Sequence, residues 1–253
     1  MRKTNAWLFL SLIIGFTACN NDDDDKPNNS ITSDEAAVIV SSSFSSNTSG
    51  VNFVSTESAG TSEDLLEDNA NGRVAACGAS KNIDLSGESP DGGSITWSYD
   101  FSYKFQLNCN DEEKPSSVSV DLSYSGDFSG PKLSTEHSGT SELDLIGLEE
   151  SVENFLLEGF YKRSGSFEQK EGDKKSGSSS IEIDLADVVI DKQTHKIISG
   201  TATYTLTGTV PAKGDYTYEG TVTFQGEDTA DLKVGDDNFS LNLRSGDIVK
   251  KIE

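Results

Sequence analysis

Strict alternation of apolar and polar side chains from Ser94 to Cys109 constrains the fold of this chain more than any other feature. The odd positions from Ile95 to Leu107 carry apolar or aromatic side chains, whereas the even positions carry hydroxyl, amide or charged side chains. A period of two is the signature of a β-strand, in which successive side chains point to opposite faces. The stretch therefore predicts one long strand with an apolar face and a polar face.

The same period recurs towards the C-terminus and predicts about nine or ten strands. Short segments rich in turn-forming residues separate these strands, at 90–93, 111–115, 172–175, 191–194 and 211–215. They leave no room for a crossover helix, so we expect a long-stranded antiparallel meander. Residues 132–146 are poorer in apolar side chains and fit an edge or irregular strand. Residues 154–167 carry apolar side chains in both phases, which weakens the strand pattern there.

Four glycines fall in the apolar phase of these strands: Gly126, Gly200, Gly208 and Gly220. Glycine inside a strand marks bulges, and the loss of side chains from one face lets a sheet bend towards that face. We therefore expect a strongly curved sheet, either a half-barrel or a closed barrel.

The N-terminal part of the domain lacks the period of two and predicts one or two short helices within residues 34–71. Ser33 is the expected N-cap of a first helix that runs to about Phe44, with acidic residues in its first turn. A second helix is expected to begin near Thr61 or Ser62 and to stop at Gly72, after a brief extended piece at 51–54. The fold class is thus mainly β, with a single domain spanning 34–253.

The first residues carry a positive pair, Arg2 and Lys3, then an apolar stretch from Trp7 to Phe16, then Cys19. The stretch is short for a membrane span. This segment resembles a bacterial lipoprotein signal, which implies removal of residues 1–18 and lipidation of Cys19. The acidic run at 22–25 resembles the export tag of Bacteroidota-type surface lipoproteins. The resemblance implies an outer-membrane, lipid-anchored and surface-exposed protein, with residues 19–33 as a flexible acidic tether.

Export to an oxidising compartment leaves Cys77 and Cys109 as the expected disulfide. The pairing also follows from the hairpin. If the chain turns at Gly92–Gly93, Leu85 faces Phe101, and continuing the same register places Cys77 opposite Cys109. Residues opposed in an antiparallel pair lie within reach of a disulfide.

Charge and motif content exclude several classes of function. The net charge of −23, which becomes −25 once Arg2 and Lys3 are removed, disfavours nucleic acid as a partner. His137 and His195 show no nucleophile at a recognisable spacing, and the many carboxylates select no glycosidase pair. Acidic loops at 226–231 and 235–238 lack the spacing of a calcium-binding EF-hand. The sequence predicts no catalytic residue, metal ligand or cofactor.

Aromatic side chains in the apolar phase are the remaining candidates for function. They either fill a core with their hydroxyls at its rim, line a cleft that holds a sugar or an apolar ligand, or face lipid. The resulting hypotheses are a surface binding module for a glycan, protein or apolar molecule, a half-barrel carrier or chaperone for lipids or lipoproteins, and a hydrolase without a recognisable motif. An open concave volume would separate these hypotheses. The candidate ligand-lining residues are Trp97, Tyr99, Tyr103, Tyr124, Tyr204, Tyr216 and Tyr218.

Overall fold

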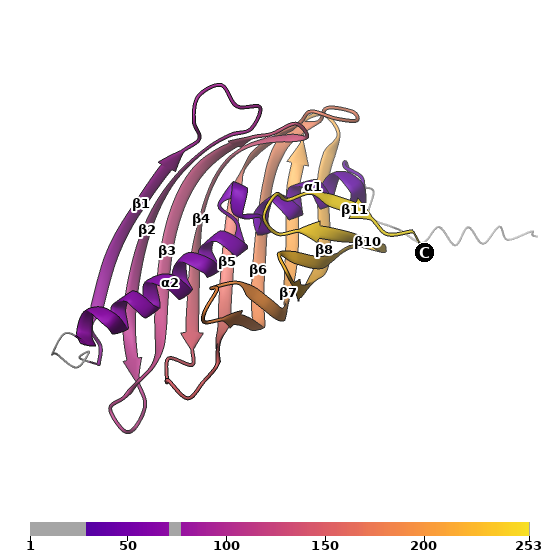
Figure 1. The fold of residues 1–253 in the computed structure, drawn as a ribbon. Coiled ribbons are helices and arrows are strands. Elements are labelled where there is room, and N and C mark those ends of the chain that lie inside the picture. The colour runs from indigo at the N-terminus through magenta and orange to yellow at the C-terminus, as the bar shows by residue number, and fades with distance from the viewer. Residues whose placement is uncertain (1–28, 71–76, 253) are drawn as a thin grey trace, which may run out of the picture.

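The computed structural model describes residues 29–70 and 77–252, which form two α-helices and one eleven-stranded antiparallel sheet (Figure 1). The strands follow one another in the sheet in chain order, so the sheet is a meander with β1 and β11 at its edges. It is an open half-barrel and not a closed barrel. The strands are β1 Ser80–Glu88, β2 Thr96–Cys109, β3 Pro115–Ser129, β4 Leu133–Ile146, β5 Asn154–Gln169, β6 Ser176–Asp191, β7 Ile197–Val210, β8 Gly214–Gly226, β9 Thr229–Val234, β10 Asp237–Asn242 and β11 Ile248–Lys250.

The alternation of β2 is confirmed, since its inward side chains from Phe101 to Leu107 are buried and the intervening ones are largely exposed. The hairpin register is also the expected one, because Leu85 pairs with Phe101. The Cys77–Cys109 disulfide closes the base of this hairpin, with 5.6 Å between the two Cα atoms.

One strand expected at an edge lies inside the sheet. β4 pairs with β3 and β5 over nearly its whole length, so the expectation of an edge or irregular strand at 132–146 was wrong. Its inward positions include Thr135, His137, Gly139 and Ser141, which hide the apolar period although His137 and Ser141 are buried. The sheet also has more strands than expected, and its last strand, β11, has only three residues.

One bulge changes the phase of β6, whose inward residues are odd-numbered up to Leu185 and even-numbered from Val188. β5 keeps one phase throughout, so Leu156 and Phe160 are apolar residues of its outward face. Gly159 of β5 and Gly200 of β7 flank the bulge, with φ of +127° and +117°. Both positions use backbone conformations that side chains disfavour, as expected for glycines at bulges.

Helix α1 (Ser33–Phe44) begins one residue earlier than predicted. Thr32 and not Ser33 is the N-cap, and Thr32 and Glu35 form a reciprocal capping box. The preceding residues were expected to belong to a flexible tether, yet Ile31 is buried and Asn29 exchanges hydrogen bonds with Thr217 of β8. Residues 19–28 of that tether, including Cys19, lie outside the described residues.

Helix α2 (Val51–Ala70) begins ten residues before the predicted start, so the expected extended piece at 51–54 is helical. Its buried side chains include Ser55, Ser58, Ala59 and Ser62, which give no apolar period of 3.6 residues. The hydroxyl of Ser62 donates to the Ser58 carbonyl at 2.7 Å, so a polar side chain is tolerated in the interior. The predicted stop at Gly72 lies outside the described residues.

Both helices lie across the concave face of the sheet (Figure 1). Phe53 of α2 packs on Tyr99 and Phe101 of β2, with ring centroids 5.3 Å apart in each pair. Phe44 of α1 contacts Phe224 of β8 at 6.3 Å. The aromatic face predicted from the sequence is therefore covered from within the chain. In the described ranges, neither helix is long and apolar enough to cross a membrane.

Candidate functional site

Four of the predicted ligand-lining residues belong to the core. Tyr103, Tyr124, Tyr204 and Tyr216 are buried under the helices or within the curve of the sheet. Trp97, Tyr99 and Tyr218 are half-buried. Rings along β2 pack on one another from Trp97 to Phe105, in four contacts of 5.4 to 5.5 Å between centroids.

Three of these tyrosines form the same cross-strand unit. Tyr204 lies over Gly220 of the adjacent strand, and its hydroxyl donates to the Lys233 carbonyl one strand further on, at 2.8 Å. Tyr216 over Gly208 and Tyr124 over Gly139 repeat this arrangement with the carbonyls of Ser178 and Lys162, at 2.9 and 3.1 Å. Each glycine leaves the space that the ring of its partner fills. We call these units tyrosine–glycine clamps. In each clamp the tyrosine hydroxyl donates its hydrogen bond to a backbone carbonyl.

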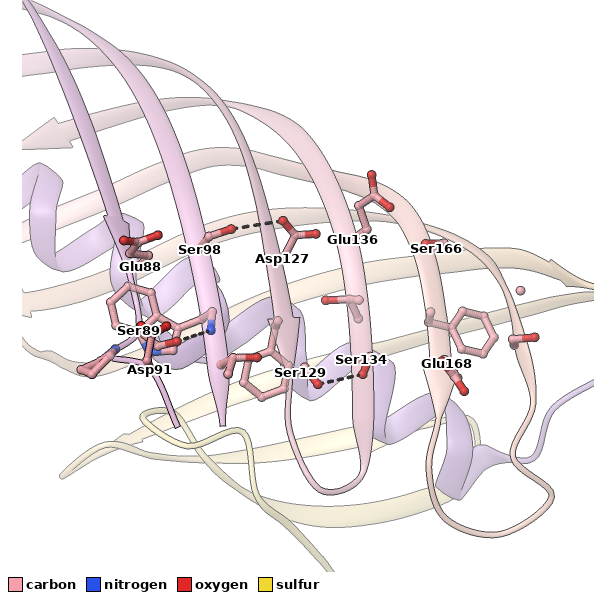
Figure 2. Close-up of a pocket in the computed structure, with 18 of the residues that line it drawn as sticks. Glu88, Ser89, Asp91, Ser98, Asp127, Ser129, Ser134, Glu136, Ser166 and Glu168 are labelled. Carbon is pink, nitrogen blue, oxygen red and sulfur yellow. Dashed lines mark hydrogen bonds between the residues drawn. The ribbon is translucent and has the colours of Figure 1, made fainter. Parts of the chain in front are cut away.

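A large hollow lies elsewhere, at the end of the sheet that carries the β1–β2, β3–β4, β5–β6 and β7–β8 turns. This rim groove is open and has a volume of about 880 Å³. Figure 2 shows its labelled side chains projecting from β1 to β5 and from the β1–β2 loop. Among the predicted residues, Trp97 alone lines it.

Carboxylates and hydroxyls dominate the lining of the rim groove (Figure 2). Ser98 donates to Asp127 at 3.1 Å across β2 and β3, and Ser134 donates to Ser129 at 3.2 Å across β3 and β4. Within the described residues, no carboxylate of the groove forms an ion pair. The five acidic residues of the lining are Glu88, Asp91, Asp127, Glu136 and Glu168.

Two of these acids are direct cross-strand neighbours. Asp127 of β3 pairs in register with Glu136 of β4, and like charges in such positions destabilise a sheet. Elsewhere on the same face Asp121 also lies opposite an acid, Glu142, but there Lys104 reaches Asp121 at 3.3 Å. No cation within the described residues offsets the repulsion between Asp127 and Glu136. Their pairing therefore does not stabilise the sheet, and stability does not explain it.

The position of Trp97 is fixed by its neighbours. Its indole stacks on Tyr99 with centroids 5.5 Å apart and planes inclined by 10°. Its backbone carbonyl accepts from the Ser89 amide at 2.8 Å, and its own amide donates to the Ser89 hydroxyl at 3.1 Å. Trp97 belongs to the inward phase of β2, whereas Ser98, Asp127 and Glu136 belong to the outward phase, so the indole borders the groove at the rim from the opposite face of the sheet.

Comparisons with protein-family models, curated proteins and solved structures find no match for this chain. The site must therefore be interpreted from its own geometry.

The two histidines lie apart from the rim groove. His137 is buried, and its Nδ1 accepts from Arg163 at 2.8 Å, which places the proton of the neutral ring on Nε2. Burial and the Arg163 charge lower the pKa of His137 to about 2. Arg163 is itself buried and also donates to the carbonyls of Ser42 and Thr48, at 2.9 and 3.1 Å. The other histidine, His195, contacts Glu63 of α2 at 2.7 Å.

The acidic C-terminal loops are paired with cations. Asp228 contacts Lys196 and Arg244, each at 3.0 Å, and Asp237 contacts Lys250 at 3.1 Å. Across the described ranges, no group of three or more His, Cys, Asp or Glu side chains is arranged to hold a metal ion.

Sequence reasoning missed the rim groove because its residues come from the ends of many strands. The available signal was the row of serine and acidic side chains in the polar phase of β3 to β6, next to turns on one side of the meander. That signal does not show which of these side chains share a hollow, because their grouping depends on the pairing of the strands.

Proposed function

We propose that this chain is a lipid-anchored surface module that binds a neutral or cationic glycan in the rim groove. The observation that carries the proposal is the groove of about 880 Å³, whose polar lining is hydroxyl and carboxylate and which the half-buried Trp97, held by Tyr99 and Ser89, borders at the rim of the sheet. Sugars present apolar ring faces for stacking and hydroxyl groups for hydrogen bonds, which suits such a lining. Uncompensated carboxylates disfavour anionic glycans.

The filled concave face supports a binding module over a carrier. A carrier for lipids or lipoproteins needs a large apolar cavity, but α1 and α2 occupy the curve of the sheet, and most of the aromatic side chains under them are buried. Within residues 29–70 and 77–252, the helices fill the curve of the sheet, and the groove for a large ligand lies at the outer rim.

The path of the N-terminus bears on where the groove would act. Asn29 bonds to Thr217, and Ser30 bonds to Asp215, beside the β7–β8 turn that also borders the rim groove. If Cys19 carries the lipid, the chain from Cys19 to Asn29 reaches at most about 35 Å. The groove would then stay close to the membrane, among the glycans of the envelope.

Binding to a panel of polysaccharides tests the proposal. We expect neutral or amino-sugar polymers such as laminarin or chitosan to retard the protein in affinity electrophoresis, and polygalacturonate to have no effect. Trp97→Ala should abolish the retardation, because it removes the stacking surface. Phe160→Ala, which removes a half-buried ring from the polar face outside the groove, should leave it unchanged. No retardation by any polymer of the panel would contradict glycan binding.

The pair of acids in the groove gives the hydrolase hypothesis a specific test. Asp127 and Glu136 are cross-strand neighbours in the groove, and glycoside hydrolysis uses two carboxylates. Release of reducing ends from a bound polymer, lost in Asp127→Asn and in Glu136→Gln, would establish catalysis. Binding without release would support the module.

The anchor is tested separately. Wild-type chain expressed in a bacterial host should incorporate labelled fatty acid and sediment with membranes, whereas Cys19→Ser should do neither. Equal labelling of both chains would contradict lipidation at Cys19 and leave the groove proposal untouched.

A further inference from the structure

A second, smaller cavity lies where distant parts of the sheet approach each other. It has a volume of about 260 Å³ and lies between α1, the 3-10 turn Ser46–Thr48, the β3–β4 hairpin and the β10–β11 turn. Lys132 of the first hairpin and Asp247 of the second turn lie 4.0 Å apart, nitrogen to oxygen. We call this cavity the seam pocket. It is distinct from the rim groove, although Phe128 lines both.

Apolar side chains from several elements line the seam pocket. Val38 of α1 and Ile248 of β11 pack against the core, and Leu133 of β4 is buried. Ile95, from the loop before β2, is 40 % exposed and also borders the cavity. The lining is thus apolar on several sides, with Phe128 completing it.

The polar groups of α1 that face the cavity already have partners. The hydroxyls of Ser41 and Ser42 donate to the carbonyls of Val38 and Ile39, at 3.0 and 2.7 Å. Water in the pocket would find few hydrogen-bond partners on this wall. The cavity is partly open to solvent at Ile95 and Lys132, and apolar side chains form most of its remaining walls. The cavity is therefore suited to an apolar ligand.

Lys132 supplies charge selectivity at this cavity. Its ammonium has only the long contact to Asp247 among the described residues, and its side chain is 44 % exposed. An anionic head group can approach such an ammonium from solvent while an apolar tail enters the pocket.

We infer that the seam pocket binds a single medium-length acyl chain with an anionic head, the tail between Val38, Phe128 and Ile248 and the head at Lys132. The inference goes beyond the glycan proposal, because the two cavities have different linings. Failure of either proposal leaves the other standing.

Calorimetric titration of the full chain carrying Cys19→Ser with decanoate tests the inference. Decanoate should bind saturably with one site per chain. Ile248→Phe adds a ring to the pocket wall and should weaken binding at least about tenfold. Val249→Phe is the matched control, because the neighbouring side chain is 69 % exposed, and it should bind like the parent. Val38→Phe fills the pocket from α1 and replaces Ile248→Phe if that variant does not fold.

Decanol tests the role of the charge, and lipid vesicles test the source of the acyl chain. Lys132→Gln should weaken decanoate by about fivefold to tenfold and leave decanol unchanged, since the alcohol lacks the charge. Co-sedimentation with phosphatidylglycerol vesicles that Ile248→Phe abolishes would identify a membrane lipid as the source of the chain. Decanoate binding without such co-sedimentation would identify a free fatty acid. The inference is overturned if decanoate does not bind saturably, if neither filling variant affects it, or if Lys132→Gln affects decanol equally.

Discussion

A buried histidine beside a buried arginine makes stability depend on pH. His137 has a pKa of about 2 in the folded chain and about 6.5 in the unfolded chain. Between these values the unfolded chain binds a proton that the folded chain does not bind. The contribution of His137 to the free energy of unfolding is therefore complete above pH 6.5. Below that pH it falls by up to about 1.4 kcal/mol for each pH unit.

We predict that the free energy of unfolding of the wild type falls more steeply than that of His137→Gln between pH 7 and pH 4.5. The excess loss should be about 2 to 3 kcal/mol, because only the wild type carries the depressed group. Urea unfolding at both pH values measures it. A difference between the two proteins that stays constant with pH would show that His137 does not titrate in this way.

The tyrosine–glycine clamps make a second prediction for single residues. Gly220→Ala should cost at least about 2 kcal/mol, since a Cβ there would collide with the Lys233 carbonyl and the Tyr204 ring. Tyr204→Phe should cost about 1 kcal/mol, the value of one hydrogen bond. Thr221→Ala, on the exposed face of the same strand, should stay within about 0.5 kcal/mol. Equal losses for the two alanine variants would refute the steric argument.

Among elements, the attachment of the helical region to the sheet depends on β5. Arg163 donates to carbonyls at the end of α1 and of the following 3-10 turn, and Tyr161 donates to the Ser49 carbonyl at 3.2 Å. We predict that Arg163→Met destabilises the protein by about 3 kcal/mol, because the Thr48 carbonyl and His137 Nδ1 lose the Arg163 donor and the Ser42 carbonyl keeps only the Thr48 hydroxyl. Amide exchange should accelerate at residues 42–49.

Lys162→Met is the matched control for this prediction. Lys162 is the adjacent residue, faces solvent and pairs with Glu182 at 3.1 Å. Exposed pairs of this kind contribute at most about 1 kcal/mol. If both variants cost the same, or if exchange at residues 42–49 is unchanged in Arg163→Met, the attachment does not depend on Arg163.

Elements differ in how far the sequence predicts them. β2 was predictable because every inward position is apolar, and the hairpin register followed from its turn. Helix α2 was not, because Ser55, Ser58 and Ser62 occupy its buried face and no apolar period results. The internal place of β4 was hidden for a similar reason: its inward His137 and Ser141 are buried through partners, Arg163 and the Phe160 carbonyl, that only the fold supplies.

At the scale of the whole molecule, the disulfide restrains a sheet edge. Cys77 and Cys109 are separated by 32 positions in the chain and join the start of the β1 hairpin to the end of β2. Closing a loop of this length stabilises by about 3 to 4 kcal/mol on the chain-entropy account. We predict that loss for the Cys77→Ser/Cys109→Ser double variant in urea unfolding. Reductant should lower the stability of the wild type only, and a loss below about 1 kcal/mol would contradict the entropy account here.

The candidate site was less predictable than the fold. Trp97 was among the residues expected to contact a ligand, and it lines the rim groove. The carboxylates of the groove could not be selected from the 43 acidic residues of the sequence, because their proximity depends on pairing such as that of Asp127 with Glu136. Tyr124, Tyr204 and Tyr216 had the right phase, but their hydroxyls donate to backbone carbonyls, a role that needs the glycine opposite each ring.

The meander order also sets the sequence in which the chain can fold. Each strand pairs only with its neighbours in the chain, so the sheet can assemble hairpin by hairpin as the polypeptide emerges, with short loops to close. The N-terminal helices cannot form all their contacts hairpin by hairpin, because some of their partners belong to the last strands. Ser46 donates to Leu243 and Asn47 donates to Arg244, so the first described elements are fixed in place by the last ones. Complete docking of the N-terminal helices therefore requires that synthesis has reached the end of the sheet, and a chain truncated before β10 would keep its hairpins and the contacts of the helices to β2 and β5 but lose the bonds that hold Ser46 and Asn47.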